Sequence, residues 1–161
     1  MAYSPKKLVN AYSSGNGGVH FESRVVASFV SIMLARGMCP GLDGCRINWV
    51  ASQNRYRRVQ TDDVLVHATH LATDKPVRLY GQVKHRPAIR KDDKQFLEVI
   101  AAGWHDFINT ELFNKKYDVI ALITGPLSEK EGRETRDLLE HARLAGSEFA
   151  FYEQLKPENF I

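Results

Sequence analysis

Three polar residues near the middle of the chain have types and a spacing suited to hydrolysing a phosphodiester bond. Asp63 opens one expected strand, while Gln82 and Lys84 stand two apart on the next and share a face. A hairpin would bring them together. Two oxygen ligands suit magnesium, with manganese as the alternative, and such an ion activates water. Lys84 would hold that water or offset charge on the phosphate. The pattern is short, and it also fits a solvated polar strand face.

Glu22 adds a carboxylate from a separate element. At about 100° per residue it lies between Phe29 and Met33, within the apolar arc of an expected helix. A carboxylate in that position costs stability unless it is paired or bound to a cation. Two interpretations stay open: a buried salt bridge to Arg36 or Lys84, or a place at the metal site as ligand or water positioner.

A run of basic side chains follows Lys84 and could contact backbone phosphates beside the cut. A solvated charged loop is the alternative. The residues are His85, Arg86, Arg90, Lys91 and Lys94.

The elements that must position these residues follow from periodicity and from turn residues. The sequence predicts three helices. The first spans residues 19–35, the second begins at an N-cap at Asp92 or Asp93, and the third runs from a Ser128/Glu131 capping box to about Ala145. It predicts strands at 46–51, 62–72, 77–84, 117–125 and 148–154, with a turn at 74–76. The expected fold class is α/β, a mixed sheet flanked by helices.

Burial is expected to follow the same patterns. Strand 77–84 should pack one face and leave Arg78, Tyr80, Gln82 and Lys84 on a polar face. The continuous apolar run at 117–125 predicts a central strand buried on both faces. The second helix should bury one apolar face, made of Phe96, Leu97, Ile100, Trp104, Phe107 and Ile108.

Length and composition indicate one globular domain. The chain has 161 residues, 43% of them hydrophobic, and a formal net charge of +3, which permits a polyanionic partner without requiring one. Residues 1–16 are expected to be a flexible lead-in to a domain at 17–161. Cys39 and Cys45 lack metal-site spacing and are expected as reduced thiols. Without a signal-like start or an apolar run of about 18 residues, we expect a cytoplasmic protein with no membrane partner.

Three segments resemble one nuclease superfamily. The helix GGVHFESRVVASFVSIMLARG, the strand start TDDVLV and the strand YGQVKH are similar to the PD-(D/E)xK nucleases, specifically their QxK branch. That branch includes Mrr-like restriction endonucleases and the N-terminal DNA-degrading effector domains of bacterial anti-phage signalling proteins, and the motifs resemble the effectors most. The resemblance covers residues 17 to about 125 and implies a restriction-endonuclease-like αβββαβ core. Three motifs in the right order are more specific than any one of them.

The resemblance also implies roles. Glu22 takes that of the first-helix acid, Asp63 that of the metal-binding aspartate, Gln82 the (D/E) position and Lys84 that of the catalytic lysine. Asp62 replaces the proline of the name motif, which leaves open which aspartate is the main metal ligand. Strand parity with the following positions favours Asp63. Because Gln82 is uncharged, metal binding would depend more on Asp63 and Glu22.

The leading hypothesis is a magnesium-dependent endonuclease that cuts double-stranded DNA with little sequence preference, because no separate segment for contacting base edges is evident. If the resemblance to anti-phage effectors holds, a sensor or assembly module lies outside this chain. One site hydrolyses one strand, which favours a homo-oligomer as the active form. The alternatives are a catalytically inactive module of this fold that binds DNA or a protein partner, and a nuclease that acts on RNA.

Overall fold

A computed structural model describes residues 17–52, 59–90, 93–147, 149–150 and 153. The chain divides into two compact units, residues 1–125 and 126–161. The expected lead-in, 1–16, lies outside the described residues. The first unit contains α1 (Gly17–Leu34), β1 (Cys45–Ser52), β2 (Val64–His70), β3 (Lys75–Lys84), α2 (Lys94–Ile108) and β4 (Val119–Thr124).

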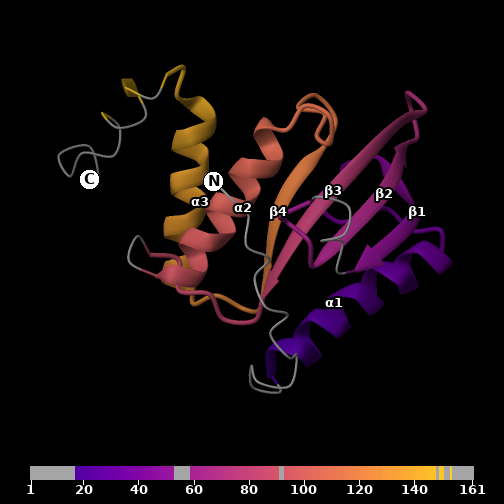
Figure 1. The fold of residues 1–161 in the computed structure, drawn as a ribbon, viewed down its shortest axis with the longest axis horizontal. Helices are drawn as coiled ribbons and strands as arrows, with labels where there is room; N and C mark the ends of the chain where they lie inside the picture. Colours follow the sequence, from indigo (N-terminus) through magenta and orange to yellow (C-terminus); the bar gives the residue numbers. More distant parts are fainter. Residues whose placement is uncertain (1–16, 53–58, 91–92, 148, 151–152, 154–161) are drawn as a thin grey trace, which may run out of the picture. The chain divides into compact units, whose positions relative to one another are not determined.

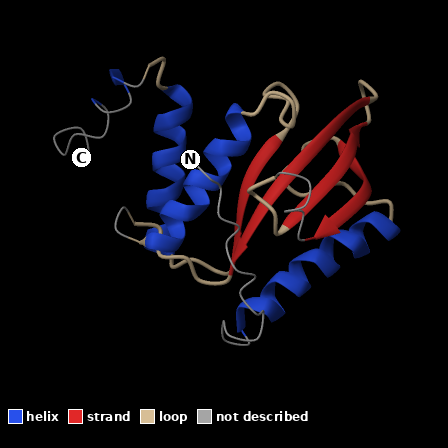
Figure 2. Cartoon of the chain, in the orientation of Figure 1, coloured by secondary structure: helices blue, strands red, loops and turns tan. Residues whose placement is uncertain are grey.

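The first unit is built on one mixed four-stranded sheet in the order β1-β2-β3-β4 (Figure 1). The first two pairings are antiparallel and the pairing of β3 with β4 is parallel. Helix α1 packs on one face and α2 lies on the other (Figure 2). The α/β class and the mixed sheet flanked by helices are therefore confirmed.

The β2–β3 hairpin sets the register on which the candidate site depends. Val64 pairs with Gly81 and Leu65 with Tyr80, so Asp63 precedes the ladder at the level of Gln82. A Cβ on Gly81 would lie 2.5 Å from Cγ1 of Val64, so only glycine fits there. The turn lies earlier than the expected 74–76, because β2 ends at His70 and β3 already begins at Lys75, and a positive φ at Asp74 helps to reverse the chain.

The larger core lies between α1 and the sheet. Phe29 of α1 is buried there with Val64, Val66, Leu79 and Val83. This confirms the expected inward face of the first helix. Cys39 and Cys45 are buried free thiols in the same core, and burial, followed by the nearby Cys45, raises the pKa of Cys39 to about 11.

The second face of β3 is not the exposed polar face that the sequence predicted. Tyr80 and Gln82 are both buried. Tyr80 packs in a smaller core with Val59, Leu65 and Phe113. Alternation placed these side chains on one face correctly, but it could not show that the 109–113 connection and α2 cover that face.

Helix α2 begins as expected, with Asp93 as its N-cap accepting a hydrogen bond from the Phe96 backbone N–H at 2.8 Å. The expected buried face is wrong. Four of its residues are about half exposed or more, whereas the buried positions of the helix are Gly103 and Asp106. The close approach explains this, because a Cβ on Gly103 would lie 3.3 Å from Cγ2 of Ile120 on β4. The exposed residues are Leu97, Ile100, Trp104 and Ile108.

Strand β4 is also placed differently from the prediction. It lies at an edge of the sheet rather than in its centre, and it is half-buried, with Val119 exposed. Its parallel partner β3 covers one of its sides only. A continuous apolar run predicted the strand but not its place in the sheet.

The second unit contains α3 (Glu129–Leu144), which begins with the expected capping box. The Ser128 hydroxyl accepts from the Glu131 backbone N–H, and the Glu131 carboxylate accepts from the Ser128 backbone N–H. The expected last strand is wrong where it can be examined, because Phe149, Ala150 and Glu153 are helical. The Ser147 hydroxyl accepts from the Ala150 N–H and favours that helical start. The rest of 148–154 lies outside the described residues.

Candidate active site

The hairpin brings together the three residues singled out from the sequence. The Oδ2 atom of Asp63 accepts hydrogen bonds from the backbone N–H of Val83 at 2.7 Å and from the side-chain amide of Gln82. The Nζ atom of Lys84 lies 3.4 Å from the same oxygen. A carboxylate, an amide and an ammonium group therefore share one point at the end of β3.

Glu22 of α1 lies close enough to Asp63 and Lys84 for their charges to act on it. Burial raises the pKa of Glu22, repulsion from Asp63 and more weakly from Asp62 adds to the rise, and Lys84 opposes it. Both open interpretations keep support, because Lys84 attracts the Glu22 carboxylate whereas Asp63 and Asp62 repel it. Three carboxylates and one ammonium group give a local excess of negative charge, which a divalent cation would relieve.

A cleft of about 430 Å³ opens beside these residues, within the first unit. The sheet side of the cleft includes Gln82 and Lys84, whose side chains share a face of β3. Asp62 also lines it. Gln60 lies on the lining as well. The opposite wall is formed by residues of α2, which are Glu98, Val99, Ala101, Ala102 and His105.

The two aspartates have different surroundings. Asp62 is buried and lines the cleft, whereas Asp63 is held by the backbone of β3. Strand parity does not separate them, because β2 begins only at Val64 and both aspartates lie in the irregular segment before it.

Sequence reasoning missed what α2 contributes. Glu98 and His105 lie on one face of the helix, about two turns apart, and both line the cleft. Between them stand the small side chains of Ala101 and Ala102. The spacing of Glu98 and His105 could have indicated a polar face of this helix, but the apolar residues at its other positions obscured that pattern.

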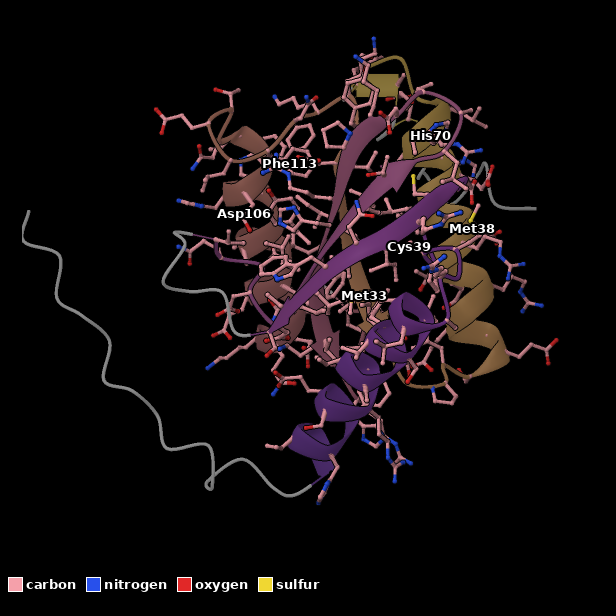
Figure 3. All side chains as sticks on the ribbon, turned by 90° about the vertical axis from the view of Figure 1, so that its right-hand side faces the viewer. Met33, Met38, Cys39, His70, Asp106 and Phe113 are labelled. Atoms are coloured by element: carbon pink, nitrogen blue, oxygen red, sulfur yellow. The ribbon has the colours of Figure 1, made fainter. Side chains whose placement is uncertain are left out.

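Asp106 was missed as well. Its side chain is 1% exposed, and its carboxylate accepts hydrogen bonds from the backbone N–H groups of Gln60 and Thr61, the latter at 2.6 Å. Figure 3 labels Asp106, which lies on α2. Asp106 therefore joins α2 to the segment that leads into Asp62.

The basic residues after β3 lie on the surface where the structure describes them. His85, Arg86, Arg90 and Lys94 are exposed, and Lys91 lies outside the described residues. The ring centroids of His85 and Phe21 are 5.2 Å apart. Phe21 directly precedes Glu22 in α1. This contact ties the end of β3 to α1.

The carboxylate and amide oxygens at the site are ligands that suit a hard cation, although the carboxylates alone do not form a complete ion site. Within the described ranges, no group of three or more His, Cys, Asp or Glu side chains is placed to hold an ion. Magnesium is commonly held by one or two carboxylates plus water and phosphate oxygens, so a complete protein shell is not required. The Gln82 amide nitrogen is directed at Asp63, and turning that amide by half a rotation would present its oxygen instead.

Comparison of the chain with protein-family models, with curated proteins and with solved structures found no match. Among the described helices, none has the length and apolar character needed to cross a membrane.

Proposed function

We propose that this chain is a metal-dependent endonuclease of the PD-(D/E)xK type, in the QxK branch, with a restriction-endonuclease-like core. The observation that carries the proposal is the convergence of Asp63, Gln82 and Lys84 on one point, with Lys84 Nζ 3.4 Å from Asp63 Oδ2. The order of elements from α1 to β4 agrees with an αβββαβ core. Glu22, which approaches from α1, supports it further.

The proposed site would hold Mg²⁺, or Mn²⁺ in its place, through Asp63, Glu22 and the Gln82 amide oxygen, with Asp62 as a further candidate. Such an ion would supply charge that polarises the phosphate and lowers the pKa of a water. Lys84 donates hydrogen bonds to the attacking water or to the phosphoryl oxygens, where negative charge develops. Asp63 orients Lys84 by their ion pair, while the Val83 N–H keeps the Asp63 carboxylate in place.

Double-stranded DNA is the proposed substrate, cut with little sequence preference. Backbone phosphates would be contacted by the basic residues after β3, and such contacts do not depend on the base sequence. These residues are the exposed His85, Arg86, Arg90 and Lys94, together with Lys91. We further propose a cytoplasmic anti-phage effector that acts as a homo-oligomer and is controlled by a sensor or assembly module outside this chain. RNA as substrate is the competing outcome of the same assay.

The decisive experiment incubates the purified chain with supercoiled plasmid and with duplex RNA, with Mg²⁺ and with EDTA. We expect magnesium-dependent nicking and linearisation of the plasmid, and loss of both in Lys84→Ala. Cleavage that persists in EDTA, or that survives Lys84→Ala in a folded protein, would contradict the proposal. Preferential RNA cleavage would keep the chemistry and change the substrate.

A second candidate function is a catalytically inactive module of the same fold that binds DNA or a protein partner. One observation favours it: the Gln82 amide nitrogen, not its oxygen, is directed at Asp63, so these two side chains satisfy each other without an ion. A gel-shift assay in EDTA separates the two candidates. Tight DNA binding with no cleavage in Mg²⁺ or Mn²⁺ would establish the inactive module.

A further inference from the structure

We propose that Asp106 is a positioning residue for the candidate active site: from α2, it fixes the backbone that carries Asp62 and Asp63. The inference rests on the proposed function, because it assigns a role within the same site. Asp106 itself is not among the residues that line the cleft, so it would act through the two aspartates rather than on the substrate.

The segment before β2 needs such an anchor. Residues 59–63 are irregular, and the sheet ladder begins only at Val64. Asp106 Oδ1 accepts from the Gln60 N–H at 2.9 Å, and Oδ2 accepts from the Gln60 N–H at 3.1 Å and the Thr61 N–H at 2.6 Å. One carboxylate therefore holds two consecutive amides that the sheet does not pair.

These amides stand directly before the site residues. Asp62 follows Thr61 in the chain, and Asp63 is held from the other side by the Val83 N–H at 2.7 Å. The two aspartates thus lie between one anchor on α2 and another on β3. A shift of the 60–61 backbone would move both carboxylates relative to Lys84.

Helix stability does not account for an aspartate at this position. Asp106 lies in the last turn of α2, where the helix dipole disfavours an anion, and its side chain is 1% exposed. A buried carboxylate is tolerated when hydrogen bonds satisfy it. The backbone amides supply them, and His105, which lines the cleft, lies 3.5 Å away through Nδ1. Asp106 therefore contacts two residues that line the cleft, Gln60 and His105.

Asp118 provides a matched control. Its side chain is 2% exposed, and its carboxylate accepts from the backbone N–H groups of Arg78 at 3.0 Å and Asn114 at 2.8 Å, and from the Arg78 guanidinium at 2.6 Å. Arg78 lies near the start of β3, whereas Lys84 ends it. Asp118→Asn therefore weakens a similar buried anchor away from the candidate site.

The first test measures hydrogen–deuterium exchange of the wild type, Asp106→Asn and Asp118→Asn without metal or DNA. We expect amide exchange across residues 60–66 to rise about tenfold in Asp106→Asn, because one hydrogen-bond anchor is weakened, and to stay at the wild-type rate in Asp118→Asn. Unchanged exchange across 60–66 in Asp106→Asn would overturn the positioning role, whatever the activity.

The second test asks whether the anchor serves the chemistry. In Asp106→Asn we expect kcat for plasmid cleavage to fall about 100-fold with little change in KM, and calorimetric Mn²⁺ affinity to fall about tenfold. Asp118→Asn should keep both near wild type. Equal losses in the two variants would mean general destabilisation and overturn the proposal. If the wild type neither cuts nor binds Mn²⁺, the proposed function fails, and the exchange result alone then decides whether Asp106 positions this segment.

A second pair of variants removes the donor instead, in case Asp106→Asn does not fold. Gln60→Pro deletes one N–H that Asp106 accepts, whereas Gln60→Ala deletes the side chain and keeps that N–H. Faster exchange across 61–66 in Gln60→Pro, but not in Gln60→Ala, supports the anchor. Equal exchange in both contradicts it.

Discussion

The ammonium nitrogen of Lys84 lies 3.4 Å from Oδ2 of Asp63, farther than the 2.7 Å that separates that oxygen from the backbone nitrogen of Val83. The backbone, rather than the lysine, therefore sets the orientation of Asp63. The Lys84 side chain is 30% exposed and that of Asp63 17%, so solvent still screens the pair in part, and we expect it to contribute no more than about 1 kcal/mol to folding. Lys84 is thus available for chemistry at small cost to the fold.

Lys84→Ala should accordingly separate activity from stability. We expect plasmid cleavage to fall by at least about 100-fold, because charge developing on the phosphate loses its donor. The free energy of unfolding should change by less than about 1 kcal/mol. Lys130→Ala, which removes an exposed lysine paired with Glu134 at 3.7 Å, is the control and should leave both unchanged. Native circular dichroism with undiminished cleavage in Lys84→Ala would place the site elsewhere.

The two aspartates can be separated by substitutions of different shape. Asp63→Ala leaves the buried Val83 N–H without its acceptor, and we expect a loss of about 1–3 kcal/mol in urea denaturation as well as loss of cleavage. Asp63→Asn can still accept that bond, so it should lose cleavage while keeping most of the stability. Asp62→Asn should lower activity less. If it abolishes cleavage while Asp63→Asn stays active, Asp62 is the main metal ligand.

Glu22→Gln should reveal a dependence of stability on pH. Burial, then repulsion from Asp63, raises the folded-state pKa of Glu22 above 4.5, so ionised Glu22 destabilises the fold. That destabilisation is absent well below pH 4.5, develops as the pH rises through the unfolded and then the folded pKa, and is complete above both. Thermal denaturation should therefore show Glu22→Gln more stable than wild type at neutral pH and equal to it at low pH.

The control for this series is Glu140→Gln, which removes an exposed carboxylate of α3. It should change the melting temperature less than Glu22→Gln does at neutral pH. Adding Mg²⁺ should narrow the difference between wild type and Glu22→Gln, because the ion offsets the repulsion. A Glu22→Gln variant less stable than wild type at neutral pH would instead support the salt bridge to Lys84.

Gly81→Ala tests the register of the hairpin. The added Cβ would lie 2.5 Å from Val64 Cγ1 and 3.0 Å from Ile123 Cδ1, so either the Val64 side chain or β3 must shift. We expect a loss of about 1–3 kcal/mol in denaturant unfolding. Gly132→Ala in α3 is the matched control, because nothing lies within 4 Å of its added Cβ. It should stabilise its helix by up to about 1 kcal/mol. A neutral Gly81→Ala would contradict the packing of β2 against β3.

The sequence predicted those features that depend on neighbours along the chain. The caps at Asp93 and Ser128, the inward face of α1 and the β2–β3 hairpin are of this kind, and the structure confirms them. The hairpin also brings Asp63, Gln82 and Lys84 together, because strand spacing alone determines which side chains of β3 share a face.

Features that depend on distant contacts were not predicted. The apolar run of β4 is typical of a central strand, yet β4 lies at an edge of the sheet. The apolar residues of α2 concealed the face that meets the sheet. Asp106 was missed because its partners, the amides of Gln60 and Thr61, are backbone groups present at almost every position of any sequence. Only the fold selects which amides meet that carboxylate.

The last prediction concerns assembly. The first unit contributes one Asp63–Lys84 site, and one such site hydrolyses one strand at a time, so a double-strand break needs two copies or two visits. The isolated chain should therefore mainly nick supercoiled plasmid. A fused dimerisation tag should raise the ratio of linear to nicked product, because the second site is held near the first cut at high effective concentration. The control is the same fusion carrying Lys84→Ala in one partner of a heterodimer, which should return the ratio to that of the untagged chain. Equal ratios for tagged and untagged wild type at the same site concentration would show that assembly does not govern cutting of the second strand.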